Sequence, residues 1–153
     1  MLNKSNFWKN KKVIVIGSGG FKGKWLVALL KILKAKVVGI NKTSLKSKNF
    51  KNYKANLLDE KKIALIFKKE KPKVVFHLAA QPIVSESYKN PLDTYKTNIL
   101  GLLNVLELIR KHTFIKSTII VTSDKCYRVN EKSSDKPLVE ESALGGNDPY
   151  SAS

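Results

Sequence analysis

The stretch Val13-Ile14-Val15-Ile16-Gly17-Ser18-Gly19-Gly20-Phe21-Lys22-Gly23 decides the fold of this chain. Its first four residues are β-branched and apolar without alternation, which is typical of a strand buried on both faces of a parallel sheet. Apolar residues at helical spacing between Trp25 and Leu33 predict a helix directly after the glycines. A strand, a glycine turn and a helix in this order can hold a pyrophosphate, because the first N–H groups and the dipole of the helix point toward the turn.

The glycine spacing is compatible with a dinucleotide site. Gly17, Gly20 and Gly23 are spaced three and three residues apart, whereas the commoner fingerprint has a spacing of two and three. Glycine tolerates positive φ and lets a phosphate approach the backbone closely. A glycine-rich turn without a ligand is the alternative, but the flanking strand and helix favour dinucleotide binding.

The rest of the chain alternates short apolar runs with segments of helical period. Strands are predicted at 12–16, 36–40, 53–55, 74–78 and 118–122, and helices over the apolar residues from Trp25 to Leu33, at 60–70 and at 91–111, with a loop around Pro82. A further helix is predicted to begin at Asp148-Pro149, after a polar, irregular stretch. The alternation predicts an α/β fold of Rossmann type, in which about five parallel strands carry helices on both faces.

The net charge of +17 would ordinarily suggest a nucleic acid or an anionic membrane as partner. All but two of the 29 basic residues are lysines, however, and they are scattered rather than interleaved with arginine and aromatic residues. We therefore expect a solvated lysine surface and no specific nucleic-acid partner. A basic nucleic-acid-binding module remains the alternative.

Other bulk features point to an ordinary cytoplasmic protein. No apolar run approaches the roughly 18 to 20 residues of a membrane span, and residues 1–12 are too polar for a secretory signal. Cys126 is the only cysteine and has no neighbouring Cys or His at zinc-ligand spacing. We expect a reduced structural thiol, no metal site and no membrane association.

Two strand ends are candidate sites, because open parallel sheets bind ligands beyond the carboxyl ends of their strands. The strand at 74–78 leads into Leu78-Ala79-Ala80-Gln81, whose small residues would let a cofactor lie against the backbone. His77 in that strand is interpreted as a packed core histidine. The strand at 118–122 leads into Ser123-Asp124-Lys125, where three proton-active groups favour chemistry over a simple capped turn.

These motifs together resemble the extended short-chain dehydrogenase/reductase superfamily. The resemblance is carried, in order along nearly the whole chain, by the glycine turn, Leu78-Ala79-Ala80, Thr97-Asn98 and Pro149-Tyr150-Ser151-Ala152-Ser153. Within the superfamily the stretches Gly20–Gly23, His77–Pro82, 122–127 and 144–150 resemble the CDP-glucose 4,6-dehydratases of the NAD-dependent epimerase/dehydratase family, and Ser123-Asp124-Lys125-Cys126-Tyr127 discriminates best.

The resemblance implies a lyase of deoxysugar biosynthesis that converts the nucleotide sugar CDP-D-glucose to CDP-4-dehydro-6-deoxy-D-glucose with NAD. In such an enzyme NAD+ removes hydride from sugar C4, water leaves across C5 and C6, and the hydride returns to C6. By motif position Tyr150 would be the base at the C4 hydroxyl, Ser123 its helper, Asp124 the acid at the departing C6 hydroxyl, and Lys125 the group working at C5.

The resemblance also implies the cofactor-binding residues. These are Gly17, Gly20, Phe21, Gly23, Asn41, Asn56, Leu57, Leu78, Ala79, Ala80, Gln81, Thr97, Asn98 and Thr122. Two positions depart from the family pattern. Asn41-Lys42 replaces the acid that binds the ribose hydroxyls in many NAD enzymes, and Asn56 replaces an acid near the adenine. Charge therefore does not decide between NAD and NADP, and NAD is expected by resemblance.

Activity of this chain alone is not expected. A phenol is a poor base at neutral pH without a nearby cation, and the family supplies a lysine four residues after the tyrosine, at position 154. We expect residues 1–153 to be a truncated NAD-binding Rossmann domain without the substrate-binding carboxyl-terminal lobe of a homo-oligomeric enzyme. Another nucleotide-sugar epimerase or dehydratase and a noncatalytic NAD-binding module remain alternatives.

Overall fold

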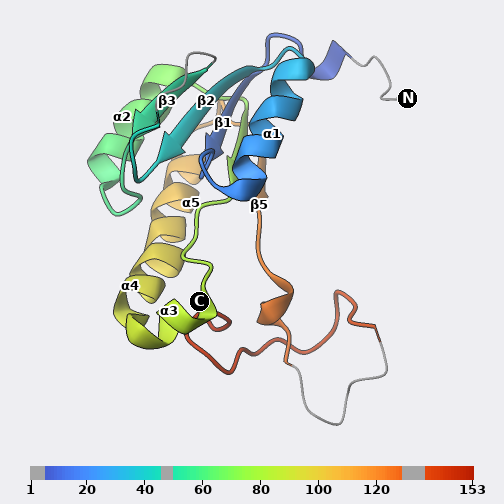
Figure 1. Ribbon diagram of the computed structural model, residues 1–153. Helices are drawn as coiled ribbons and strands as arrows, with labels where there is room; N and C mark the ends of the chain where they lie inside the picture. The colour runs from blue at the N-terminus through green and yellow to red at the C-terminus, as the bar shows by residue number, and fades with distance from the viewer. Residues whose placement is uncertain (1–5, 46–49, 129–136) are drawn as a thin grey trace.

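The computed structural model describes residues 6–45, 50–128 and 137–153. Five parallel strands form one sheet in the order β3-β2-β1-β4-β5 (Figure 1). The strands are β1 Lys12–Ile16, β2 Lys36–Asn41, β3 Lys51–Lys54, β4 Val74–His77 and β5 Ser117–Ile120. The longer helices are α1 Phe21–Ile32, α2 Glu60–Glu70 and α5 Gly101–Lys111. This arrangement confirms the predicted Rossmann-type fold.

Most predicted elements recur with boundaries shifted by one or two residues. β1 and α2 have the predicted bounds, β2 extends to Asn41, and β3, β4 and β5 end earlier than predicted. The predicted helix at 91–111 is continuous but divided, because a π-helical turn, η2 Lys96–Leu100, lies between α4 Pro91–Tyr95 and α5. The predicted loop after Pro82 is wrong in part, since it contains the short helix α3 Val84–Lys89.

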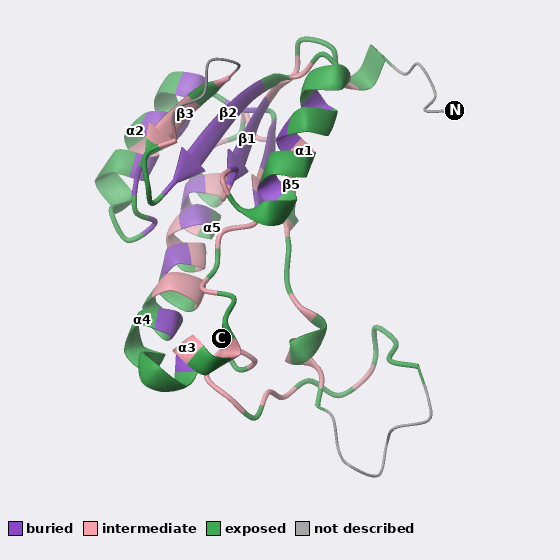
Figure 2. Cartoon of the chain, in the orientation of Figure 1, coloured by how far each residue is buried: buried purple, intermediate pink, exposed green. Residues whose placement is uncertain are grey.

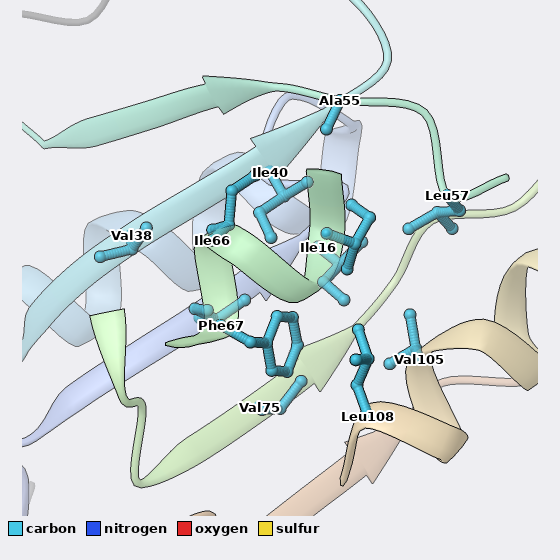
Figure 3. Packing of buried hydrophobic residues seen from close by; sticks show 12 residues of the cluster. Ile16, Val38, Ile40, Ala55, Leu57, Ile66, Phe67, Val75, Val105 and Leu108 are labelled. Atoms are coloured by element: carbon cyan, nitrogen blue, oxygen red, sulfur yellow. The ribbon is translucent and has the colours of Figure 1, made fainter. Parts of the chain in front are cut away.

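Two apolar layers hold helices on opposite faces of the sheet, because successive strand residues point to opposite sides. On one face, strand residues such as Ile16 and Ile40 pack against Phe67 of α2 and Val105 of α5 (Figure 3). On the other face, Val13 and Val15 pack against Val27 and Leu30 of α1. Figure 2 shows the central strands as the most continuously buried part of the chain. β1 is apolar without alternation because helices cover both faces of the sheet at this strand.

A buried carboxylate ties three elements together at the amino-terminal end of the sheet. Glu70, at the end of α2, is 4% exposed and accepts hydrogen bonds from Lys51 Nζ at 2.5 Å, Tyr53 Oη at 2.6 Å and Lys12 Nζ at 3.3 Å. Burial alone would raise the pKa of Glu70, but the bonds from Lys51, Tyr53 and Lys12 outweigh it and lower the pKa to about 2. The carboxylate therefore stays ionised and joins β1 and β3 to α2.

Beyond β5 the chain is less regular. A 3₁₀ turn, η3 Asp124–Cys126, follows the strand, and Tyr127 forms an isolated antiparallel bridge with Leu144. At the predicted helix start, Asp148 O accepts from Ala152 N at 3.0 Å, which closes one helical turn. No helix in the described part of the chain is long and apolar enough to cross a membrane.

Candidate functional site

A cleft of about 720 Å³ lies at the carboxyl ends of the strands. It is centred where β1 is flanked by β2 on one side and β4 on the other, which is the switch point at which open α/β sheets bind ligands. Most of the predicted site residues line it: Gly17, Gly20, Phe21, Gly23, Asn41, Asn56, Leu57, Leu78, Ala79, Ala80, Thr97, Asn98, Thr122, Ser123, Lys125 and Tyr150. Gln81 and Asp124 are not among the lining residues.

At two of the three glycines Gly17, Gly20 and Gly23, a Cβ atom would lie too close to the neighbouring backbone. Gly17 has a φ of 86°, and a Cβ there would lie 2.8 Å from the backbone nitrogen of Ala79. A Cβ at Gly23 would overlap the carbonyl oxygen of Gly17, so helix α1 could not approach the turn. A Cβ at Gly20 would lie 3.4 Å from its nearest neighbour, the Gly17 carbonyl oxygen, which is ordinary contact.

This turn fits the pyrophosphate of a dinucleotide. Gly20 is the N-cap residue of α1, and no side chain caps the helix. The N–H groups of the first helical turn therefore lack partners within the helix and carry its positive dipole end. They border the cleft through Phe21, Lys22 and Gly23. Ala79 and Ala80 also line the cleft, and their small side chains leave room for a ligand.

The side chain of Asn41 is hydrogen-bonded to the glycine turn and to β3. Its Oδ1 accepts from Gly19 N at 2.7 Å, and its Nδ2 donates to Ser18 Oγ at 2.7 Å and to Asn52 Oδ1 at 2.6 Å. The residue is 9% exposed. The amide thus fixes the turn against β2 and β3 and supplies no charge to the cleft.

Leu57 and Asn56 form the wall beyond β3. Asn56 Oδ1 accepts from Leu58 N at 3.1 Å, which fixes the local turn. Leu57 is 7% exposed, and its carbonyl accepts from Asn104 Nδ2 at 2.9 Å. A largely apolar surface therefore faces this part of the cleft.

The π-helical turn η2 brings Thr97 and Asn98 to the cleft. π-Helical turns inside α-helices often occur at functional sites, because they shift the side chains that follow. Asn98 Oδ1 accepts from Gln81 N at 2.8 Å, and its Nδ2 donates to Gln81 O at 3.2 Å and to Ser153 Oγ at 2.8 Å. Asn98 thus joins the segment after β4 to the end of the described chain.

Gln81 does not line the cleft but is hydrogen-bonded within the segment after β4. Its side chain donates to Thr94 Oγ1 at 3.1 Å and accepts from Ile83 N at 2.7 Å. These bonds hold the loop between β4 and α3 against α4. Gln81 is therefore placed to support the loop on which Ala79 and Ala80 lie.

Ser123 and Lys125 line the cleft at the end of β5, whereas Asp124 is not among the lining residues. Ser123 caps the 3₁₀ turn by accepting from Lys125 N at 3.2 Å, and its hydroxyl donates to Asp124 Oδ1 at 3.2 Å. The predicted capped turn and the predicted cluster of proton-active groups are therefore the same feature of the structure.

Tyr150 reaches the cleft on a turn organised by Asp148. One carboxylate oxygen accepts from Tyr150 N and Ser151 N, both at 3.0 Å, and the other accepts from Ser151 Oγ at 2.5 Å. The Ser151 hydroxyl and the two backbone N–H groups lower the pKa of Asp148, and the nearby charge of Lys125 adds to this effect. Asp148 was not predicted as a site residue, although its position before Pro149 at a predicted helix start was the available signal.

His77 occupies an unusual position for a core histidine. It is 4% exposed and borders the cleft, and its buried Nδ1 has no hydrogen-bond partner among the described residues. Burial lowers the pKa of His77 to about 4, so the ring is neutral at pH 7. The sequence predicts a packed core histidine here, but it does not show that this residue borders the site.

The charged side chains among the described residues that line the cleft are all basic, and the sequence analysis did not predict this. Lys22, Lys42 and Lys125 line it, and the described residues that line it include no Asp or Glu. None of the described His, Cys, Asp and Glu residues forms a group that could hold a metal ion. The arrangement suits an anionic ligand bound through backbone N–H groups and lysines.

Comparison with known proteins yields one consistent group of relatives. The model of the GDP-mannose 4,6 dehydratase family matches residues 14–153. A CDP-glucose 4,6-dehydratase of Salmonella typhimurium is 36% identical over 97% of this chain and 44% of its own length.

Solved structures agree with this grouping. The UDP-glucose 4-epimerase of Thermotoga maritima, solved with UDP-glucose, is 30% identical with a TM-score of 0.83, over 92% of this chain and 46% of that one. The UDP-glucose 4-epimerase of Brucella ovis, solved in complex with NAD, is 25% identical with a TM-score of 0.81, over 92% of this chain and 43% of that one. This chain therefore spans less than half the length of each of these relatives.

Proposed function

Since the chain belongs to the GDP-mannose 4,6 dehydratase family, we propose that residues 1–153 form the NAD-binding domain of an enzyme that dehydrates CDP-glucose to CDP-4-dehydro-6-deoxy-D-glucose. One observation carries the proposal. The glycine turn that suits a pyrophosphate and the side chains suited to proton transfer, Ser123, Lys125 and Tyr150, line one and the same cleft. The 36% identity to a CDP-glucose 4,6-dehydratase supports the choice of substrate.

In this proposal the dinucleotide lies across the carboxyl ends of β1, β2 and β4. The turn at Gly17, Gly20 and Gly23 would hold the pyrophosphate, and the small residues from Leu78 to Ala80 would let the cofactor lie against the backbone. A bound NAD+ would supply reversible hydride acceptance at the sugar. The complex of Brucella ovis UDP-glucose 4-epimerase with NAD supports this choice of cofactor.

The chain's own residues would handle protons. Tyr150 would take the proton of the C4 hydroxyl, and Ser123 would hydrogen-bond to the same oxygen. Lys125, if it entered the step as the neutral amine, would take the proton from C5, and Asp124, if it entered as the protonated carboxylic acid, would donate its proton to the departing C6 hydroxyl, so that water leaves and a C5–C6 double bond forms. The Asp124 carboxylate accepts from the Ser123 hydroxyl at 3.2 Å, so its role requires a rotation toward the cleft.

The remaining length of the relatives would complete the enzyme. The chain covers 44% of the length of the Salmonella enzyme. We propose that a further lobe binds the nucleotide sugar, that the complete enzyme is a homo-oligomer, and that residues 1–153 alone do not turn over substrate.

Product analysis of a full-length enzyme that contains these residues tests the proposal. Incubation with NAD+ and CDP-glucose should give a nucleotide sugar that has lost one water, detected by mass spectrometry. dTDP-glucose and UDP-glucose at equal concentration should react more slowly. An unchanged CDP-glucose pool beside rapid dehydration of another nucleotide sugar would overturn the proposed specificity.

A second candidate function is epimerisation at C4. The 30% identity to the Thermotoga maritima UDP-glucose 4-epimerase favours it. An epimerase would convert UDP-glucose to an isomer of equal mass, which chromatography separates from the starting sugar. Loss of water from CDP-glucose and isomerisation of UDP-glucose therefore distinguish the two functions in one assay.

A further inference from the structure

Helix α1 has a second apolar face, on the side that points away from the sheet. Val27 and Leu30 pack on the sheet and are buried. Trp25, Leu29 and Ile32 are spaced four and three residues apart, so they share one face of the helix, and they are 69%, 40% and 74% exposed. Single exposed apolar residues are common on protein surfaces, whereas a contiguous stripe of them marks an interaction surface.

This outward face of α1 is separate from the dinucleotide cleft. Phe21, at the start of the helix, lines the cleft, but Trp25, Leu29 and Ile32 do not. Figure 1 shows α1 on the outside of the sheet, and Figure 2 shows its outer side as exposed. No element in the described part of the chain covers the stripe, which can therefore meet a broad surface.

Lysines flank the stripe on both sides. With 3.6 residues per turn, Lys22 lies on the Leu29 side of the stripe, and Lys24 and Lys31 lie on the other side. All three lysines are exposed, and no ion pair among the described residues includes a lysine of α1. The first 58 residues contain fourteen lysines and no acidic residue, so β1, α1, β2 and β3 supply no carboxylate that would offset this charge.

Apolar residues between lysines match a surface that offers both acyl chains and negative charge. Tryptophan is favoured at the boundary between lipid headgroups and acyl chains, because its ring is apolar and its N–H is polar. Neighbouring lysines can reach anionic headgroups. A nucleic acid would offer phosphates but no apolar layer for Leu29 and Ile32, and a second copy of the chain would bring its own lysines against these lysines.

We infer that the outward face of α1 binds the surface of a membrane that contains anionic lipids, with Trp25, Leu29 and Ile32 at the acyl boundary and the flanking lysines at the headgroups. The inference does not depend on what occupies the cleft. It goes against the expectation of no membrane association, which relied on the lack of a spanning run and of a secretory signal, because a peripheral helix face needs neither. Binding should be reversible and should weaken as salt is raised.

Co-sedimentation of the 153-residue chain with lipid vesicles tests the inference. At physiological salt we expect binding to vesicles of phosphatidylglycerol and phosphatidylcholine in equal amounts, and little binding to phosphatidylcholine alone. The double variant Trp25→Gln/Ile32→Gln should bind the anionic vesicles about tenfold more weakly or worse, because it removes the apolar contact. The double variant Lys24→Gln/Lys31→Gln should also bind about tenfold more weakly.

The matched control is the double variant Leu65→Gln/Lys68→Gln. It changes an exposed leucine and an exposed lysine of α2, which packs on the opposite face of the sheet, and should leave vesicle binding within about twofold of the unmodified chain. Tryptophan emission is a second readout. Anionic vesicles should shift it to shorter wavelength, and Trp25→Phe, which keeps an apolar ring, should still bind but lose most of that shift.

Three outcomes would overturn the inference. Equal binding by Trp25→Gln/Ile32→Gln and the unmodified chain would show that lysines attract the vesicles without the apolar face. A chain that binds no vesicles but forms a dimer in analytical ultracentrifugation, lost in that double variant, would assign the face to a second copy. Vesicle binding by the 153-residue chain but not by an enzyme of the relatives' full length would assign the face to a contact within that enzyme.

Discussion

Gly23 and Gly20 lie in the same turn, but the absence of a side chain matters for a different reason at each. A Cβ at Gly23 would overlap the Gly17 carbonyl, whereas a Cβ at Gly20 would make ordinary contact. Gly23→Ala should therefore destabilise the fold by about 1–3 kcal/mol and abolish NAD+ binding. Gly20→Ala should change the free energy of unfolding by less than about 1 kcal/mol but still weaken NAD+ binding, because its methyl group would occupy the phosphate approach.

Urea unfolding and NAD+ titration of both variants check this separation. Equal stability of Gly23→Ala and the unmodified chain would show that α1 can move away from the turn. Unchanged NAD+ affinity in Gly20→Ala would place the pyrophosphate elsewhere.

His77 should make stability depend on pH in a window set by its own titration. Its pKa is about 4 in the folded chain and about 6.5 in an unfolded one. Between these two pH values the unfolded chain binds a proton that the folded chain does not. The free energy of unfolding therefore falls as the pH drops from 6.5 to 4, and above pH 6.5 the titration of His77 no longer changes it. The loss between pH 7.5 and pH 5 should be about 2 kcal/mol.

The His77→Leu variant removes the titrating ring and the unpaired Nδ1 while keeping a similar volume. Its unfolding free energy, measured in urea at pH 7.5 and pH 5, should change less between the two pH values than that of the unmodified chain. The same pH dependence in both proteins would show that His77 is solvated or paired when folded.

At the scale of the element, Glu70 joins α2 to β1 and β3. Glu70→Gln leaves Lys51, Lys12 and Tyr53 around a neutral amide, and should lower the free energy of unfolding by about 2–3 kcal/mol at pH 7. The ionised carboxylate has a pKa of about 2 in the folded chain and about 4.3 when unfolded. Its contribution is therefore complete above about pH 4.3 and is lost as pH falls toward 2.

Glu107→Gln is the matched control for this prediction. Glu107 pairs with Arg110 and Lys111 on the exposed surface of α5, where ion pairs contribute little to stability. Chemical denaturation at pH 7 should show a change below about 0.5 kcal/mol for this variant. A Glu70→Gln variant as stable as Glu107→Gln would contradict the linking role of Glu70.

The elements that could be predicted from sequence are those whose local pattern agrees with their burial. β1 and α2 match their predicted bounds because an unbroken apolar run and a clear apolar helix face mark them. α3 could not be predicted, since its sequence Val-Ser-Glu-Ser-Tyr-Lys has no such face. The π turn η2 was missed because the apolar residues from Tyr95 to Ile109 keep ordinary helical spacing, which predicts one continuous α-helix.

The position of the candidate site could also be predicted only in part. Glycines between a strand and a helix indicated the phosphate turn, and the position of Ser123 after a buried strand placed it near the same edge. The pattern could not show that Gln81 and Asp124 do not line the cleft, because their hydrogen bonds to neighbouring residues form only in the folded chain. The lysines around the cleft were interpreted as general surface, since their convergence depends on the folded chain. The catalytic roles of Ser123, Asp124, Lys125 and Tyr150 stay predictions.

At the scale of the whole molecule, two segments far apart in sequence contribute to one site. The glycine turn lies near the start of the chain, and Thr122, Ser123 and Lys125 lie about a hundred residues later, yet both groups line the cleft. Parallel order explains this, because β1 and β5 present their carboxyl ends at the same edge of the sheet (Figure 1).

An NMR titration of the ¹⁵N-labelled 153-residue chain with NAD+ at physiological salt tests most directly whether these segments bind one dinucleotide. We predict saturable shifts of the backbone amides of Gly17, Gly20 and Gly23 together with those of Ala79 and Thr122. Shifts confined to exposed lysine-rich surfaces that disappear as salt is raised, or no shifts in a folded chain, would contradict a shared dinucleotide site.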